Sequence, residues 1–464
     1  MASIDKAGGV ITSTYKKLFA GLLTSLVFLL PYERIPSLPV RVLGASIDLR
    51  LSFLVGAAML VLVIWSVTLA KQKLRVKLEL HHYLLAAFFF VYLMSALLSV
   101  DLKRALTVWV FTAFTAGVGV SVGLLWQYRD SLAIRKALWI TTWIVLVFGF
   151  YQYFGDIFGL PQSWTGLRDI YTKEIFGFPR IQSTGLEPLF YGNFLLIPFF
   201  YFSSRFLNNL EERPLLLIAI STQIALTVSR GALISGIAGL TVLIVLSLRG
   251  VSHWKNIHQQ AGLIGITVLG TTLALLLTNV NSLGILSKDS SLPSTSASPA
   301  PVAVINQATN LTSQDDRVRN RDLAWQAFQG QPWLGIGPGN FSAYAKDKYA
   351  GYEGSEGYIV VNNEPLELLA ESGAIGFSMF LLMVSTIVWQ LYKAWQHVTP
   401  QENEWPAVVL AYLLALAIQY QTFSTLYIMH VWVLIGIGMG AVTGHVPKKP
   451  TRKLPDKKPR PHRS

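Results

Sequence analysis

Long apolar runs recur through most of the chain. They lie near residues 17–31, 50–70, 82–100, 105–126, 137–155, 189–205, 214–228, 231–248, 261–280, 371–393, 406–424 and 427–443. Each run approaches the roughly 20 residues that a helix needs to cross the hydrocarbon core of a membrane. Only 14% of the 464 residues are charged, whereas soluble domains carry about 25%. The runs therefore predict an all-α fold, a polytopic transmembrane helix bundle of about twelve spans. The first run is expected to be a retained span.

Lysine and arginine residues are unevenly distributed between the runs. With the N-terminus inside, the inner connections carry dense basic clusters such as residues 71–77, and the outer short connections carry fewer basic residues. This bias follows the positive-inside rule and places both termini in the cytoplasm. The assignment depends on the runs at 214–228 and 231–248 being separate, because one long helix would reverse every later connection.

The chain divides into four parts by this reading. A long extracytoplasmic loop interrupts the bundle, and its first part, rich in Ser, Pro and Ala, is expected to be flexible. Its second part is expected to form an ordered cap with short helices, because residues 321–328 have helical spacing and residues 363–372 resemble a short helix leading into a span. The predicted boundaries are 1–280 for spans 1–9, 281–370 for the loop (281–315 flexible, 316–370 ordered), 371–446 for spans 10–12 and 447–464 for a basic cytoplasmic tail.

Two classes of site are excluded by the residues themselves. The chain has no cysteine, so it has no disulfide framework, thiolate metal site or cysteine nucleophile. Its formal net charge of +13 could suggest a nucleic-acid partner, but the basic residues lie in short loops and the tail, where membrane orientation accounts for them. The segment Gly335–Gly339 lacks the following Gly-Lys-Ser/Thr of a nucleotide loop and predicts a tight turn.

Three polar features far apart in sequence fall on the same predicted outer face. They are Arg230, Arg321 and the segment 362–367. Arg317 and Arg319 precede Arg321, and guanidinium groups bind phosphate oxygens in a bidentate manner. These arginines could therefore hold a phosphate-bearing ligand. An interfacial anchor for Arg230 and a solvated helix face for the other arginines are the alternatives.

Several motifs in one order resemble the O-antigen ligase and O-antigen polymerase superfamily. They are Thr227-Val-Ser-Arg-Gly-Ala232, Arg321-Asp-Leu-Ala-Trp325, Pro332 to Phe341, and Asn363-Glu364 with Leu366 to Gly376, preceded by Arg180 to Thr184 and Glu187-Pro188. The resemblance covers roughly residues 180–376. It implies a bacterial inner-membrane enzyme that transfers a glycan from undecaprenyl pyrophosphate to a hydroxyl of a glycan or lipid acceptor. The reaction would take place at the outer face and use no cofactor and no metal.

The resemblance also implies roles for individual residues. Arg230 and Arg321 would stabilise negative charge on the leaving pyrophosphate, and Glu364 and Asn362 complete the expected catalytic set. The residues expected to bind substrate are Arg180, Glu187, Arg317, Arg319, Asn363, Glu367 and His430.

The chain departs from the family pattern at Asn362, which stands where the ligases have a histidine. An asparagine side chain cannot accept a proton as a base near neutral pH. Either a carboxylate such as Glu187, Glu364 or Glu367 serves instead, or the protein is a polymerase-like variant. It could also be an inactive scaffold of a polysaccharide-export complex, or an inorganic-carbon transporter whose arginines attract bicarbonate. Against the transporter, the apolar runs carry almost no ionisable residues at mid-depth.

Overall fold

A computed structural model describes most of the chain. The described residues are 13–34, 37–42, 45–68, 78–210, 213–248, 253–282, 311–352, 358–399, 402–424 and 426–443. The tail 447–464, most of the segment predicted to be flexible and the basic cluster 71–77 lie outside the described residues.

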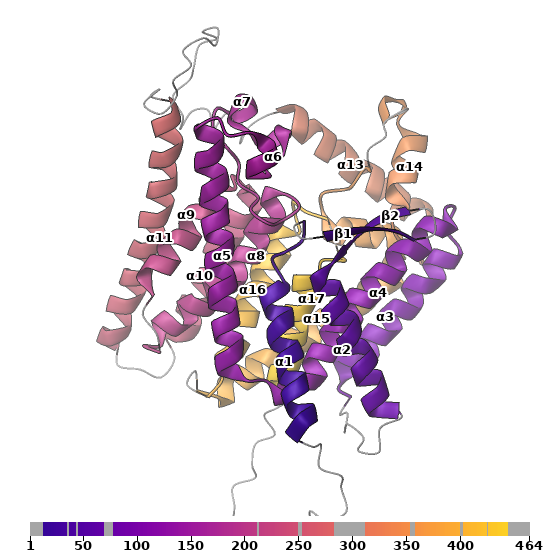
Figure 1. The fold of residues 1–464 in the computed structure, drawn as a ribbon. Helices are drawn as coiled ribbons and strands as arrows, with labels where there is room; N and C mark the ends of the chain where they lie inside the picture. The colour runs from indigo at the N-terminus through magenta and orange to yellow at the C-terminus, as the bar shows by residue number, and fades with distance from the viewer. Residues whose placement is uncertain are drawn as a thin grey trace, which may run out of the picture.

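Every predicted apolar run falls on a helix of the described chain (Figure 1). These helices are α1 (Ser13–Leu29), α2 (Leu51–Thr68), α3 (Leu80–Leu97), α4 (Leu102–Leu125), α5 (Ser131–Ile157), α8 (Pro188–Leu207), α9 (Pro214–Leu226), α10 (Arg230–Ser247), α11 (His253–Ser282), α15 (Glu364–His397), α16 (Trp405–Gln419) and α17 (Met429–Thr443). In the described residues seven helices are long and apolar enough to cross a membrane, and three shorter ones are apolar. The helical class is confirmed, and the count of about twelve crossings stays a prediction.

Shorter elements lie between the long helices. The segment after α5 contains α6 (Gln162–Thr165), η2 (Asp169–Tyr171) and α7 (Lys173–Phe176), and η1 (Trp126–Tyr128) extends α4. After α11 come α13 (Leu311–Gly330), α14 (Phe341–Lys348) and η3 (Ala350–Tyr352). Helices α6, α7, α13 and α14 all lie at one end of the bundle, called the upper end below (Figure 1). Helix α13 begins at Leu311, within the segment 281–315 that the sequence predicted to be flexible.

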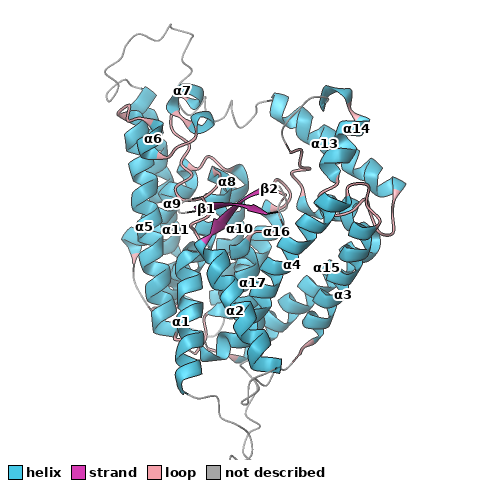
Figure 2. Cartoon of the chain, turned by 45° about the vertical axis from the view of Figure 1, so that its right-hand side comes forward, coloured by secondary structure: helices cyan, strands magenta, loops and turns pink. Residues whose placement is uncertain are grey.

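A two-stranded hairpin is the one departure from helices among the described residues. Strands β1 (Ser37–Val42) and β2 (Ala45–Arg50) pair antiparallel, with Ser37 opposite Arg50. The hairpin lies across the upper end, between α1 and α2 (Figure 2). The fold class remains all-α, and in this one short connection the backbone groups are satisfied by pairing of its two strands.

Helices α9 and α10 are separate, as the orientation argument requires. The residues between them are Thr227, Val228 and Ser229, and Val228 has φ of 51°. The Ser229 side chain accepts a hydrogen bond from the Ala232 N–H and so caps α10. One continuous helix through this region is excluded.

Ion pairing at the lower end helps to fix the direction of the helices. Helix α8 begins after Glu187 and ends near Arg205, whose guanidinium lies 3.1 Å from the Glu404 carboxylate just before α16. Helix α16 therefore starts at the lower end and returns upward to the turn 420–424. This turn lies at the upper end, where the candidate site is found.

Helix α15 is broken near its start. Gly373 has φ of 65° and ψ of −176°, so residues 364–372 form a short helix before the long one. The turn before α14 is hydrogen-bonded across this break: Ile336 N–H donates to Ala370 O (2.9 Å) and Gly337 N–H to Glu371 O (3.0 Å). The short helix expected at 363–372 is confirmed, and it holds α13 and α14 on the bundle.

The molecule has two apolar cores. The larger one fills the helix bundle, with residues such as Trp126, Tyr153, Phe200 and Trp432 fully enclosed. The smaller one lies beneath α13 and α14, and its members are Leu323, Ala324, Ala327, Ile336, Phe341, Ala345, Val361 and Ala370. Because the α13–α14 segment buries apolar side chains of its own, it can hold charged side chains in fixed positions.

Candidate functional site

The turn 420–424, which links α16 to α17, joins three of the sequence motifs. Arg321 donates from Nη2 to the Gln421 carbonyl oxygen (2.8 Å). Asn363 donates from its backbone N–H to Ser424 Oγ (2.9 Å), and its side-chain amide donates to Gln421 Oε1 (3.2 Å). Helices α13 and α15 are therefore anchored to the same five-residue turn.

A third helix, α10, begins beside this turn with Arg230. It is the first residue of α10, and its side chain is exposed. A methyl group added to the Cα atom of the next residue, Gly231, would lie 2.7 Å from Thr422 Oγ1. Glycine is thus needed for α10 to begin against the turn. Arg230, Arg321 and the segment 362–367 are brought together, as the sequence predicted.

The three arginines of α13 do not all lie on the same face of the helix. Arg317 and Arg321 are four residues apart and share one face of the helix. Arg319 lies on the other side, where it pairs with Asp316 (2.8 Å) and covers the Tyr349 ring at 4.2 Å. The structure therefore does not bring Arg319 to the cluster, although the sequence analysis grouped it there.

Arg317 lies close enough to Arg230 and Arg321 for both positive charges to act on it. Burial lowers the pKa of its guanidinium, and the positive charges of Arg230 and then Arg321 lower it further. The Nε atom of Arg321 is buried and has no hydrogen-bond acceptor among the described residues. The three side chains therefore concentrate positive charge at the upper end of the molecule.

Arg180 adds a fourth cation from the segment before α8. Its Nε donates to the Thr227 carbonyl oxygen (3.2 Å), just before the turn that precedes Arg230. Burial is the main cause that lowers the pKa of Arg180, and the charges of Arg230 and Arg317 contribute to this lowering. We call Arg180, Arg230, Arg317 and Arg321 the arginine cluster. It is a positively charged surface built from α10, α13 and the segment before α8.

The segment 362–367 caps α15. The Asn363 side chain accepts the Leu366 N–H (3.0 Å), and the Glu367 carboxylate accepts the Val361 N–H (2.9 Å). Glu364 is buried, and its backbone N–H donates to the Tyr420 carbonyl oxygen (2.8 Å). Asn362 is half-buried and has φ of 56°. Asn363 and Glu367 therefore hold the loop in place, and Glu364 lies beside the turn that binds Arg321.

Glu187 lies at the edge of the arginine cluster. It is the residue that precedes α8, its side chain is exposed, and it lies 3.5 Å from Arg168. Its negative charge also acts on Arg180. Glu187 therefore joins the cluster to a further arginine, Arg168, which the sequence analysis did not select.

His430, which the sequence analysis expected to bind substrate, does not lie on the surface. It is fully buried inside the bundle, with Nδ1 3.2 Å from the Glu33 carboxylate and Nε2 2.6 Å from Asn193 Oδ1. Asn193 also accepts the Tyr412 hydroxyl (2.8 Å). The side chain is held in an internal polar network, so direct contact with a substrate at the arginine cluster is excluded in this conformation. The position of a span end on the sequence could not show which side of the helix faces inward.

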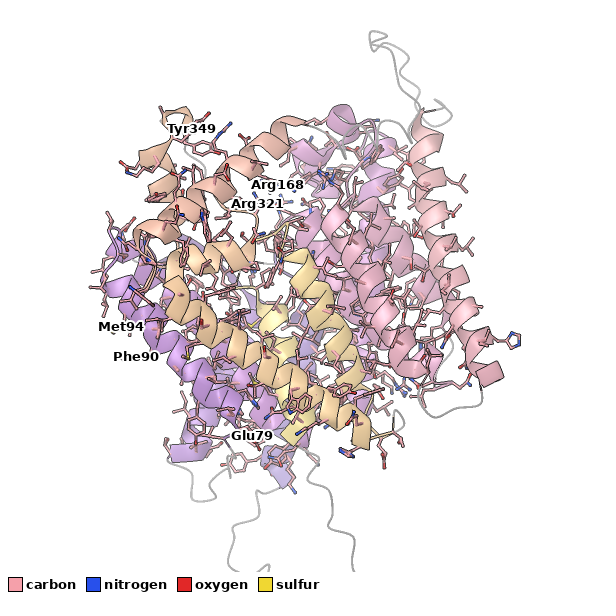
Figure 3. All side chains as sticks on the ribbon, turned by 180° about the vertical axis from the view of Figure 1, so that it is seen from behind. Glu79, Phe90, Met94, Arg168, Arg321 and Tyr349 are labelled. Atoms are coloured by element: carbon pink, nitrogen blue, oxygen red, sulfur yellow. The ribbon has the colours of Figure 1, made fainter. Side chains whose placement is uncertain are left out.

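Figure 3 places the labelled charges at the two ends of the molecule. Arg321 and Arg168 lie at the upper end, and Glu79 lies at the lower end. Sequence reasoning missed Arg168, Tyr171 and Gln421. The polar run Gln419 to Thr422 at the end of an apolar stretch was an available signal for the turn.

Comparison with known families gives one match. Residues 215–381 match the O-antigen ligase family, and no curated protein matches the chain. The matched residues begin in α9, end in α15, and include three members of the arginine cluster together with the segment 362–367. Together with several apolar helices, this match supports a multi-pass membrane protein and glycan transfer of the O-antigen ligase or polymerase type. Residues 215–381 are thus similar to the O-antigen ligase family, and this match supports the superfamily predicted from the motifs.

Proposed function

We propose that the protein transfers a glycan from undecaprenyl pyrophosphate to a hydroxyl group of a glycan or lipid acceptor, at the outer face of a bacterial inner membrane. The observation that carries the proposal is the turn 420–424, which contacts both the start of α10, where Arg230 lies, and Arg321 of α13 through the Gln421 carbonyl oxygen (2.8 Å). A diphosphate offers several oxygens at the spacing of a few ångströms that such a set of guanidinium groups can bind together.

The depth of the arginine cluster suits a donor that is anchored in lipid. Helix α9 has 13 residues and α16 has 15, so they rise about 20 Å and 22 Å. Both lengths fall short of the roughly 30 Å of a hydrocarbon core. The turns that carry Arg230 and Gln421 would therefore lie below the outer surface, close to the level of lipid head groups.

The cluster would act on the leaving group. As the acceptor oxygen bonds to the anomeric carbon of the donor sugar, the bond from that carbon to the pyrophosphate breaks. The leaving undecaprenyl pyrophosphate retains the bonding electron pair, and Arg230, Arg317 and Arg321 stabilise its charge. The acceptor hydroxyl must lose a proton in the same reaction.

Glu364 is the carboxylate that we assign as the proton acceptor. It lies two residues from Asn362, on the helix start that the turn 420–424 holds beside Arg321. Glu367 is a weaker candidate, because its carboxylate already accepts the Val361 N–H (2.9 Å). Glu187 lies beyond Arg180 and pairs with Arg168 (3.5 Å).

Replacement of single arginines tests the proposal. Arg230→Ala and Arg321→Ala should each lower glycan transfer by about 100-fold or more, the usual effect of removing one donor to a developing negative charge. Transfer is measured with purified protein in lipid nanodiscs, supplied with a lipid-linked oligosaccharide from the host and its acceptor fraction.

Arg319→Ala is the matched control, because Arg319 is on the same helix and faces Tyr349 instead of the cluster. This variant should transfer glycan at close to the unmodified rate. Equal rates in all four proteins would rule out the arginine cluster as the site of chemistry. Bicarbonate uptake into proteoliposomes that depends on Arg230, without transfer activity, would support transport instead.

A further inference from the structure

An open cavity lies beside the arginine cluster. It has a volume of about 400 Å³ and is lined by Arg34, Gln162, Leu167, Arg168, Asp169 and Ile170. This volume is within the range of roughly 300–1,000 Å³ that small-molecule sites occupy. None of these residues belongs to the family match at 215–381.

The walls of this cavity are fixed by hydrogen bonds. Arg34 donates from Nη1 to the Gly166 carbonyl oxygen (2.6 Å), and its backbone N–H donates to the Thr184 carbonyl oxygen (2.9 Å). Gln182 donates to the same Gly166 oxygen (3.2 Å). Arg34 therefore links the residue after α6 to the segment before α8. Because these hydrogen bonds already hold the lining in place, few side chains or loops need to become ordered when a ligand binds.

The chemistry of the lining matches a sugar. The two guanidinium groups offer several N–H donors, the Asp169 carboxylate accepts from hydroxyl groups, and the Gln162 amide can do both. Ile170, whose side chain is exposed, supplies apolar surface for the C–H face of a ring. The Asp169 carboxylate would repel a diphosphate, whereas a hydroxyl-rich ring can form hydrogen bonds with both the donors and the acceptors of this lining.

Tyr171 connects the cavity to the arginine cluster. Its ring centroid lies 5.6 Å from the guanidinium carbon of Arg168 and 5.5 Å from that of Arg180. The two distances together, about 11 Å, are the upper limit on the separation of these carbons. A group attached directly to a diphosphate on Arg180 can therefore reach the cavity.

We propose that this cavity binds a sugar unit of the lipid-linked donor while the arginine cluster holds its pyrophosphate. The inference rests on the proposed function, because the cluster sets the position of the pyrophosphate. The cavity then selects donors by their glycan, and the cluster binds the part that all donors share.

Two ligands separate the cavity from the cluster. The full chain in nanodiscs is titrated with undecaprenyl pyrophosphate, which has no sugar, and with the lipid-linked oligosaccharide of the host. The double variant Gln162→Ala/Asp169→Asn should bind the oligosaccharide about tenfold more weakly, the effect of losing two hydrogen-bonding groups. Its affinity for undecaprenyl pyrophosphate should not change. The matched control is Asp347→Asn, an exposed acid on α14 next to Lys348.

Each other outcome has a defined meaning. Unchanged binding of both ligands by the double variant, or equal weakening of both, would overturn the cavity as a sugar site. A raised KM for the acceptor with unchanged donor binding would also overturn it, because the cavity would then hold the acceptor. Failure of the unmodified protein to bind either ligand would instead refute the proposed function, and the inference would fall with it.

Discussion

Asn362 occupies the position of the family's histidine in a backbone conformation that few residues adopt. Its φ is 56°, in the left-handed region where Asn, Asp and His are enriched among residues other than glycine. At this position the chain therefore differs from the ligases in its side chain, whereas the backbone conformation suits both asparagine and histidine. The sequence showed the substitution but not the conformation, because φ depends on the turn before α15.

Substitutions at Asn362 should separate backbone from side chain. Asn362→Gly should retain the unfolding temperature, since glycine enters this region without steric cost. Asn362→Val should destabilise the protein by about 1–2 kcal/mol, because a β-branched residue clashes there. Thermal unfolding of detergent-purified protein measures both. Equal melting temperatures for the two variants would show that the turn has relaxed to another conformation.

Glu364 makes a second prediction at the residue scale. Glu364→Gln keeps the size of the side chain and removes its ability to take a proton. If this carboxylate is the base, the variant should lose transfer by about 100- to 10,000-fold. The affinity for undecaprenyl pyrophosphate should change by no more than a factor of about two, which is less than 1.4 kcal/mol of binding free energy. Glu367→Gln is the comparison, and its main defect should be lower stability. A Glu364→Gln enzyme with normal turnover would exclude this assignment.

At the scale of elements, the sequence predicted the helices correctly but not which side chains lie on which face of each helix. Apolar runs long enough to span a membrane leave few alternatives to a helix, because every backbone group must be paired within the segment. The run at 214–228 thus became α9 (Pro214–Leu226). The sequence grouped Arg319 with Arg317 and Arg321, yet 3.6 residues per turn places it on another face. Hairpin β1–β2 was also missed, since its strands are short and follow an apolar run.

The break in α15 is an element-scale feature with a measurable consequence. Gly373 has φ of 65°, and a methyl group on it would lie 2.3 Å from the Trp333 backbone. Gly373→Ala should therefore loosen the contact between the turn 332–337 and α15. We expect faster proteolysis between α13 and α14 and at least a tenfold loss of transfer.

Gly330→Ala is the control for this variant, because no atom lies within 4 Å of the position that the new methyl would take. It should leave both the proteolysis rate and the transfer rate close to those of the unmodified protein. Unchanged proteolysis in Gly373→Ala would show that the cap is held by other contacts.

At the scale of the whole molecule, the site depends on which end of the bundle faces outward. Helix α8 runs from Glu187, beside the arginine cluster, to Arg205, which pairs with Glu404 (3.1 Å). The cluster and Glu404 are therefore at opposite ends of one helix. The sequence predicted the cluster end to be extracytoplasmic from the positions of basic residues in the connections.

The absence of cysteine makes this orientation directly testable. Gln329→Cys places a thiol on the exposed end of α13, and Glu402→Cys places one on the exposed loop before α16. In intact cells whose outer membrane is permeable, a maleimide that cannot cross the inner membrane should label position 329 within minutes. It should label position 402 only after the inner membrane is opened. The reverse pattern would place the arginine cluster on the cytoplasmic side, where a glycan already carried across the membrane could not reach it. Equal labelling of both positions in intact cells would mean that α15, the long apolar helix between them, does not cross the membrane.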